Sequence, residues 1–320
     1  MPRALRHALR HARTIRTARE QAASSEYCAS FRGHPMLSYY SDRTNIQRRR
    51  RDARNVITPE PASVRARALS PMALLKAVNR DIPGEMVGLE IEAAGITTAA
   101  INPSRVPLVA RLQGEHCGVE VPLMARFGDW RNLRRVCALL RESGARVTRD
   151  CGGHVHIDVR DLLGRDWSHP PAEFKTRINR AAAICNHVLR FCVPHSRIGN
   201  RFCALLAPCW RMSDRYRAVN VCAIAEHGTV EIRLGAASLE PEKWAAWVSV
   251  CRWLVRHAHR KADASAAEAV TNASEAAQWL MQNANGLAPE LRGWLLWRLQ
   301  KFHPGAMPGL PPGAFGPESV

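Results

Sequence analysis

Residues 151–158, which read CGGHVHID, decide the fold because polar and apolar side chains alternate along them. In a β-strand successive side chains point to opposite faces, so His154 and His156 are expected on one face and Val155 in the core. The two preceding glycines allow a backbone or a ligand to approach closely. A neutral imidazole can ligate a metal or stabilise a phosphoryl group, and His-x-His with an acid is also a zinc pattern. The plainer alternative is a polar row on an open sheet face.

A second strand pattern lies upstream, where Glu90 and Glu92 alternate with Leu89 and Ile91. Side chains two residues apart on a strand share a face, so the two carboxylates are expected side by side. Like charges placed together repel each other unless a cation lies between them, and Mg²⁺ prefers oxygen ligands. The alternative is a solvent-exposed face with two hydrated acids, because Glu-x-Glu alone is common.

Two further short strand patterns carry acids. Residues 118–124 place Glu120 between apolar neighbours, and residues 229–234 place Glu231 and Arg233 on one face. A carboxylate there can ligate a metal, and a planar guanidinium group can hold a phosphate by two parallel hydrogen bonds. The alternatives are a solvent-facing glutamate and a surface ion pair of little energy. Together the four patterns predict a concave sheet lined with metal ligands and a phosphate clamp.

Elsewhere the apolar residues recur at helical spacing. Helices are expected at 129–144 with Asp129 as the N-cap, at 171–193, from Pro241 onward and over 263–301. The other expected elements are strands at 86–93, 118–124 and 146–159, a loop or inserted hairpin at 95–116, and a hairpin of 217–225 and 229–234 turning at 226–228. Strands interleaved with helices predict an α+β domain on a mostly antiparallel sheet.

The 320 residues carry a formal net charge of +18, which favours polyanionic partners such as nucleic acid, anionic lipid or phosphate-bearing substrates. The excess is concentrated, because residues 1–67 hold 15 Arg against 5 acids, a net of +10. Few large apolar residues recur there. Four alternatives remain open for this segment: a solvated tail, a nucleic-acid or membrane-surface arm, a mitochondrial-type targeting peptide, or an overextended gene start.

The ten cysteines include no Cys-x-x-Cys pair, and those at 137, 185, 192 and 251 fall on apolar helical faces. This usage is typical of reduced, buried cysteine in a cytosolic protein, so a cytoplasmic location is expected. No window approaches eighteen uninterrupted apolar residues, and no membrane span is expected.

Six motifs follow one another over about residues 85–260: GLEIE, GVEVP, CGGHVHID, PHSRIGNRFC, RYRAVNV and GTVEIRLGAASLEPEKW. Taken in this order, they resemble the amidoligase family. That family comprises carboxylate–amine ligases related to glutamine synthetase and glutamate–cysteine ligase. The resemblance implies a glutamine synthetase-like catalytic fold, with a curved sheet that forms an open funnel. Composition and this resemblance together predict a basic, disordered arm at 1–67, a catalytic domain at 68–262, a helical extension at 263–303 and a Pro/Gly-rich tail at 304–320.

The same resemblance implies ATP and two Mg²⁺ ions, with Mn²⁺ as the substitute. By similarity, Glu90, His154 and Glu231 would hold one ion close to the nucleotide phosphates. Glu92 and Glu120 would hold the second ion close to the substrate carboxylate. The sequence has neither a Walker A loop nor a GxGxxG nucleotide motif, as expected if metals rather than a glycine loop hold the phosphates.

Arg233 would face the transferred phosphoryl group, so Arg233, Glu120 and His156 are the predicted catalytic side chains. Nucleotide or substrate contacts are assigned by the resemblance to four further residues, namely Arg197, Asn200, Arg215 and Asn220. The partners implied are small-molecule or peptide carboxylates and amines. The sequence departs from the family at Val121-Pro122, where Ser-Pro is usual, and at residues 115–117 before that strand.

Two other functions remain open at this point. A metal-dependent hydrolase could use the His-x-His pair and the acids, and a nucleic-acid-binding protein could combine the basic arm with a degenerate ligase body. The basic segment has few aromatic rings for base stacking, apart from Tyr39 and Tyr40, which disfavours the second alternative.

Overall fold

The computed structural model describes residues 86–307, apart from 108–109, 116–117, 165–166, 168, 212–214 and 259. All of these residues belong to the unit that spans Asn55–Val320. The basic arm predicted at 1–67, the start of the predicted catalytic domain and most of the predicted tail lie outside the described residues.

A six-stranded sheet forms the centre of the described fold, and every pairing between its strands is antiparallel. Its spatial order is β2-β3-β1-β4-β6-β5. The strands are β1 (Met86–Ala94), β2 (Gln113–Glu115), β3 (Gly118–Arg126), β4 (Gly152–Asp158), β5 (Val219–Asn220) and β6 (Thr229–Ala236). The predicted α+β class with an antiparallel sheet is therefore confirmed for this part of the chain.

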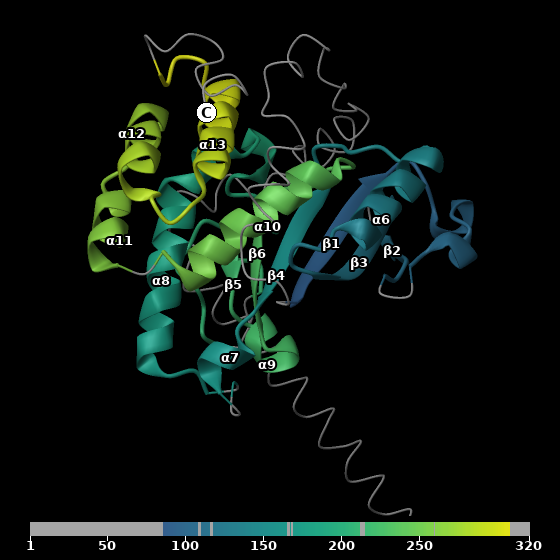
Figure 1. The fold of residues 1–320 in the computed structure, drawn as a ribbon, viewed down its shortest axis with the longest axis horizontal. Coiled ribbons are helices and arrows are strands. Elements are labelled where there is room, and N and C mark those ends of the chain that lie inside the picture. The colour runs from purple at the N-terminus through teal and green to yellow at the C-terminus, as the bar shows by residue number, and fades with distance from the viewer. Residues whose placement is uncertain are drawn as a thin grey trace, which may run out of the picture. The chain divides into compact units, whose positions relative to one another are not determined.

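One face of the sheet is the hydrophobic core, and two helices cover it. Ile91, Val155 and Ile232 on three adjacent strands point to this face, and each is fully buried. Helix α6 (Arg131–Glu142) packs on β3, and α10 (Pro241–Arg256) packs on β4 and β6. Figure 1 shows both helices on the same side of the sheet. Because strand side chains alternate, the opposite face receives the acids and imidazoles.

Helix α10 lies very close to the sheet because two glycines leave room for its tryptophans. A Cβ atom on Gly153 would stand 2.6 Å from the ring of Trp244, and one on Gly235 would stand 2.5 Å from Trp247. Real Cβ atoms do not approach other atoms so closely, so only glycine fits at these two positions. The predicted helix start at Pro241 is confirmed.

The pairing of β4 with β6 shifts by one residue partway along the strands. Gly153 is opposite Gly235, whereas Val155 is opposite Ile232, so β6 contains one extra residue between these pairs. Such a bulge bends the strand locally and changes which face the following side chains take. It lies next to His154, at the centre of the polar face.

The remaining helices are α7 (Arg160–Leu163), α8 (Ala172–His187), α9 (Ala223–His227), α11 (Lys261–Glu268), α12 (Ala273–Asn283) and α13 (Pro289–Phe302), with short 3₁₀ turns η1 (Thr98–Ala100), η2 (Pro103–Arg105), η3 (Leu189–Cys192) and η4 (His195–Arg197). Among these helices, α8 and α13 contact α10, and α9 contacts β6. The helix predicted over 171–193 thus ends in a 3₁₀ turn, and the segment predicted to be helical over 263–301 is divided among three helices.

Two local predictions were wrong. Trp130, not Asp129, is the N-cap of α6, although the Asp129 carboxylate still accepts a hydrogen bond from the Arg131 amide at 3.3 Å. The hairpin strand expected at 217–225 is only two residues long, because the Asn220 side chain accepts a hydrogen bond from the Cys222 amide at 2.9 Å and turns the chain. Helix α9 follows and ends at Gly228, whose φ of 67° suits glycine.

The cysteines predicted to be buried, at 137, 185, 192 and 251, are buried in the structure. Burial raises the pKa of the Cys137 and Cys192 thiols to about 12, so these side chains behave as small apolar groups. In the part of the chain that the structure describes, no helix is both long enough and apolar enough to cross a membrane.

Candidate metal and phosphate site

The polar face of the sheet carries a row of side chains that the strand register brings together. Glu92 is opposite Glu120, and Glu90 is opposite His154 on the next strand. His156 is opposite Glu231 further along the row. Directly opposed residues on antiparallel strands project to the same face, so groups far apart in the sequence become neighbours. This set of acids and imidazoles on the polar face is called the acid–imidazole row below.

Glu90 is the centre of the row because its two carboxylate oxygens contact two different imidazoles. One oxygen lies 2.6 Å from Nδ1 of His154, and the other lies 3.2 Å from Nε2 of His156. Burial alone would raise the pKa of Glu90, but the hydrogen bonds to both histidines outweigh it and hold that pKa well below its ordinary value. Glu90 is therefore an anion that can serve as a ligand.

His156 is held from both sides of its ring. Its Nδ1 lies 3.0 Å from the hydroxyl of Thr229, and its Nε2 faces Glu90. Burial would lower the pKa of His156, but the hydrogen bond to Glu90 and the charge of Glu231 raise it above its ordinary value. The ring orientation is fixed by these contacts, as in metal sites where a second partner orients an imidazole.

Glu231 is buried and has a cationic and an amide partner. Asn220 donates a hydrogen bond from Nδ2 to one of its oxygens at 2.5 Å, and Arg233 donates one from Nη1 to the other. Arg233 is also fixed by a hydrogen bond from Nε to the carbonyl oxygen of Phe202 at 3.0 Å. A guanidinium group thus stands beside the row, where it can meet an anionic ligand.

The donor atoms fit a divalent cation. Glu90, His156 and Glu231 each offer one ligand atom, and these atoms lie within 4.8 Å of one another. His154 also lies close, with Nδ1 3.5 Å from an oxygen of Glu231. Ligands at about 2.1 Å from one Mg²⁺ ion are roughly 3–4 Å apart, so small side-chain movements suffice. The geometry brings His156 to this position as well as the predicted ligand His154.

The other end of the row is the predicted second metal position. Glu92 accepts a hydrogen bond from the amide of Gly152 at 2.6 Å, and Glu120 accepts one from the Gln113 side chain. Burial, followed by the negative charges of Glu90 and Glu92, raises the pKa of Glu120 to about 7. Carboxylates gathered this closely repel each other, and a cation between them would relieve the repulsion.

Arg197 lies on the polar face near His154 and is 3% exposed. It donates a hydrogen bond from Nη2 to the carbonyl oxygen of Arg233 at 2.8 Å, while its buried Nε has no hydrogen-bond partner. A Cβ atom on Gly152 would stand 3.0 Å from the Arg197 guanidinium, so this glycine keeps the space beside it open. Burial lowers the pKa of Arg197 below its ordinary value, which reflects the cost of keeping this charge out of water.

Two predicted contact residues have hydrogen-bond partners outside the row. Asn200 forms a local turn in which its Nδ2 donates to the carbonyl oxygen of Ser196 at 2.8 Å and its Oδ1 accepts from the amide of Phe202. Arg215 is exposed and donates from Nη2 to the hydroxyl of Tyr216 at 3.2 Å. Asn200 therefore shapes the chain beside Arg233, and Arg215 lies on an outer rim.

Sequence reasoning missed two partners of the row. Thr229 lies two residues before Glu231 on the same strand, so the period-two argument could have placed it beside His156. Gln113 lies on the three-residue strand β2, where all residues are exposed and no alternation marks a strand. Its contact with Glu120 depends on tertiary pairing and had no signal in the sequence.

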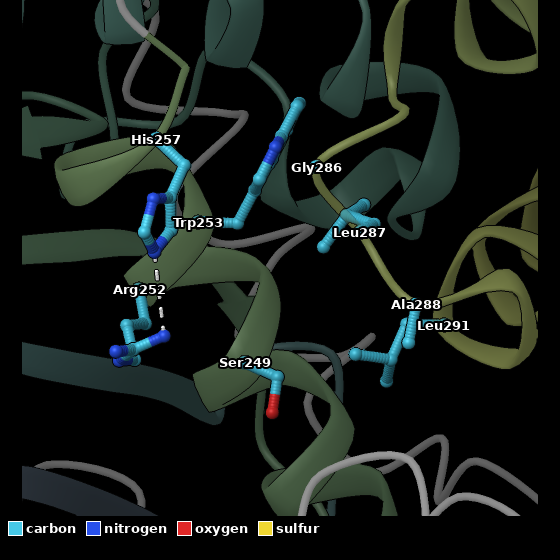
Figure 2. Close-up of a pocket in the computed structure, with 8 residues that line it drawn as sticks. All are labelled: Ser249, Arg252, Trp253, His257, Gly286, Leu287, Ala288 and Leu291. Carbon is cyan, nitrogen blue, oxygen red and sulfur yellow. Dashed lines mark hydrogen bonds between the residues drawn. The ribbon is translucent and has the colours of Figure 1, made fainter. Parts of the chain in front are cut away.

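A separate cavity of about 220 Å³ lies between α10 and the segment that leads into α13. Figure 2 shows Arg252 of α10 and His257, which directly follows this helix, on one side and Leu287 on the other, with Arg252 Nη1 3.5 Å from His257 Nε2. None of the predicted site residues lines this cavity. It belongs to the helical layer and not to the polar face of the sheet.

The fold and this site define an antiparallel α+β domain with a carboxylate–imidazole cluster and adjacent arginines. No family model matches the chain, and no curated protein matches it. Among solved structures, the chain is similar to apo GmaS without ligand, with a TM-score of 0.39 and 13% sequence identity over 74% of this chain and 72% of that chain. A likeness of this size carries no functional argument, so the proposal below rests on the site.

Proposed function

We propose that this chain is an ATP-dependent ligase that joins a carboxylate to an amine through an acyl phosphate, using divalent metal ions. The observation that carries the proposal is the acid–imidazole row with Arg233 bonded to Glu231 at its end. Carboxylates and an imidazole suit Mg²⁺ or Mn²⁺, and a guanidinium beside them suits a phosphoryl group. A site that combines both is suited to the chemistry of a metal-bound polyphosphate.

The reaction would proceed in two displacements. An oxygen of the substrate carboxylate attacks the γ-phosphorus of ATP, and ADP leaves. The nitrogen of the amine then attacks the acyl carbon, inorganic phosphate leaves, and the amine gives up a proton as the amide forms. Metal ions held by the row would neutralise charge on the phosphates during the first displacement.

The chain's own residues have separate roles in this scheme. Glu90, His154 and Glu231 are proposed ligands of one ion, and Glu92 with Glu120 of a second. His156 borders the first position and is a further donor for it. Each ligand is fixed by a neighbouring hydrogen bond, so the site needs little reorganisation when its ions bind.

Arg233 would stabilise the transferred phosphoryl group, because its guanidinium lies at the edge of the row. Arg197 supplies a second, buried positive charge in the same region, and Asn220 keeps Glu231 oriented. The proposed partners remain a small-molecule or peptide carboxylate and an amine. Nucleic acid is a further proposed partner of the basic arm at 1–67, but not the favoured one, and a cytoplasmic location is proposed from the cysteine usage.

The test is a search for a new amide. The protein is incubated with ATP, Mg²⁺ and pools of carboxylic acids and amines, and the mixture is analysed by mass spectrometry together with phosphate release. An amide whose formation requires ATP and equals the phosphate released is expected. Glu231→Gln should give no product while its circular dichroism spectrum matches the wild type. Phosphate release that continues without any amine would contradict the proposal.

A metal-dependent hydrolase is the second candidate, because one observation favours it. The three ligands Glu90, His156 and Glu231, with Thr229 behind the imidazole, also match the donors of a zinc site. Product formation that needs Zn²⁺ and no nucleotide would favour this alternative. Product formation that needs Mg²⁺ or Mn²⁺ with ATP would exclude it.

A further inference from the structure

Beyond Arg233, rings and guanidinium groups alternate on an exposed surface made by Arg201, Phe202, Arg215 and Tyr216, called the aromatic rim below. Phe202 is 43% exposed and Tyr216 is 39% exposed, although large apolar side chains of the described chain are mostly buried. Their ring centroids lie 5.9 Å apart in an edge-to-face arrangement. The Arg201 guanidinium lies 4.4 Å from the Phe202 centroid, and that of Arg215 lies 5.2 Å from the Tyr216 centroid.

The rim is fixed to the acid–imidazole row by backbone hydrogen bonds. The amide of Arg233 donates to Ala218, the amide of Ala218 donates to Ala204, and the amide of Ala204 donates to Tyr216, with distances of 2.8–2.9 Å. These bonds attach both ring-bearing segments to β6. The rim residues lie in irregular segments outside the strands, and these backbone bonds tie those segments to the sheet.

Arg233 joins the two regions through its side chain. Its guanidinium lies 5.7 Å from the Tyr216 ring centroid while it also bonds Glu231. The aromatic rim thus begins where the acid–imidazole row ends. A ligand with an anionic group at Arg233 would extend its other end over the rings.

Exposed aromatic rings beside guanidinium groups suit a ligand with a flat π-system. An exposed aromatic face gains free energy when a flat π-system covers it, and a guanidinium can stack on the same system. Because every nucleobase has such a face, stacking of this kind distinguishes bases poorly. Under the proposed function the row would hold polyphosphate, so a base attached to that polyphosphate would be directed toward the rim.

We propose that the aromatic rim is a stacking platform for the planar base of a nucleoside triphosphate, and that it accepts adenine and guanine alike. This inference rests on the proposed function, because the phosphates must lie at the acid–imidazole row. The platform would raise the affinity for nucleoside triphosphates but would discriminate little between their bases. Tyr216 and Phe202 would be binding residues and not catalytic ones.

The experiment measures binding by isothermal titration calorimetry in Mg²⁺, with ATP, GTP and inorganic tripolyphosphate as the three probes. ATP and GTP should bind within about fivefold of each other, and both more tightly than tripolyphosphate. Tyr216→Leu and Phe202→Leu should each weaken ATP about tenfold, the lower part of the range for one base–aromatic stack, and leave tripolyphosphate unchanged. Tyr216→Phe should keep the wild-type affinity.

The control is Met281→Ala on α12, which removes a side chain that is 44% exposed and lies on a different element. It should change neither affinity. The platform proposal would be wrong if ATP and tripolyphosphate bound with equal affinity, or if Tyr216→Leu weakened the binding of both probes equally. Either result would leave the proposed metal and phosphate site unaffected. Binding of none of the three probes would overturn both this inference and the proposed function.

Discussion

At the scale of single residues, Arg233 is the side chain with the most demanding set of partners. It bonds Glu231 through Nη1 and the carbonyl oxygen of Phe202 through Nε, and its plane lies near the ring of Tyr216. A lysine carries one charged nitrogen and cannot make these directed contacts at the same time. The shape of this side chain therefore matters as much as its charge.

Arg233→Lys should accordingly reduce kcat for ATP turnover about a hundredfold, as when one donor to a developing charge is lost. The change is measured by steady-state ADP release at saturating Mg²⁺, with the melting temperature recorded beside it. Arg134→Lys on the exposed face of α6 is the matched control and should retain full activity. Full activity of Arg233→Lys would remove Arg233 from the proposed mechanism.

Glu120 offers a prediction about pH. Burial and the charges of Glu90 and Glu92 raise its folded-state pKa from 4.5 to about 7, so the folded chain holds this proton more tightly than the unfolded chain does. Stability contributed by this group falls as the pH rises from about 4.5 to 7 and stays lost above that range. The chelator-treated protein should therefore melt at a lower temperature at pH 8 than at pH 5.

Glu120→Gln should reduce this decline, because the amide stays neutral over the whole range. With solvent screening the gain at pH 8 is on the order of 1 kcal/mol, or about 2–4 °C in melting temperature. Melting temperatures of both proteins in chelator from pH 5 to pH 8 provide the measurement. Parallel declines in the two proteins would show that Glu120 is not the titrating group.

At the scale of elements, the contact between α10 and the sheet depends on glycine. A methyl group at Gly153 would overlap the ring of Trp244, and this ring is 2% exposed and has no room to move. Gly153→Ala should destabilise the chain by about 1–3 kcal/mol, as overpacking of a core does. The free energy of unfolding in urea measures the effect.

Gly114→Ala is the matched control for that substitution. Gly114 lies on β2, and a Cβ atom there would meet no other atom within 4 Å. This variant should keep the wild-type unfolding midpoint or exceed it slightly, because alanine restricts the unfolded chain. Equal destabilisation in both variants would mean that packing against Trp244 is not the cause.

The strands that carry the row could be predicted from sequence, because alternation along 86–94 and 152–158 fixes both the strand and the face of each side chain. The same reasoning placed Glu90 with Glu92, and Glu231 with Arg233. It predicted a strand over 217–225, of which only Val219–Asn220 form β5, and it did not assign β2, which has no apolar alternation. These strands exist because neighbouring strands offer hydrogen bonds, and that information is not local.

Some features of the site also depend on long-range packing. The involvement of His156 beside Glu90 and Glu231 follows from the register of β1, β4 and β6, which no short motif encodes. The local turn of Asn200 could not be predicted from the sequence, because an Arg/Asn motif indicates a ligand contact and a turn equally well. A side chain that can hydrogen-bond its own backbone has two roles open to it until the fold is known.

At the scale of the whole molecule, the excess positive charge and the proposed catalytic residues lie in different parts of the sequence. Residues 1–67 carry a net charge of +10, and the proposed catalytic residues all lie between Glu90 and Arg233. Removal of residues 1–67 should leave ATP turnover within about twofold of the full chain. It should also lower the affinity for duplex DNA and reduce the slope of that affinity against salt concentration, because fewer counterions are released.

Fluorescence anisotropy with labelled duplex DNA between 50 and 300 mM salt measures both quantities. Removal of residues 308–320 is the control truncation, because that segment holds a single charged side chain, Glu318. It should alter neither the DNA affinity nor its slope. DNA binding that persists unchanged without residues 1–67 would place the polyanion contact elsewhere on the protein.

The extra residue in β6 determines which side chains the ligand would meet. Residues 231, 233 and 235 would share one face of a regular strand, yet Gly235 abuts Trp247 while Glu231 and Arg233 face the opposite way. A regular pleat through all the residues of β6, with Gly235 anchored under the helix, would turn Glu231 inward and Ile232 outward. The carboxylate would then be stranded among apolar groups at a cost of several kcal/mol. One extra residue in β6 thus keeps the polar side chains of this strand on one face of the sheet and its apolar side chains on the other.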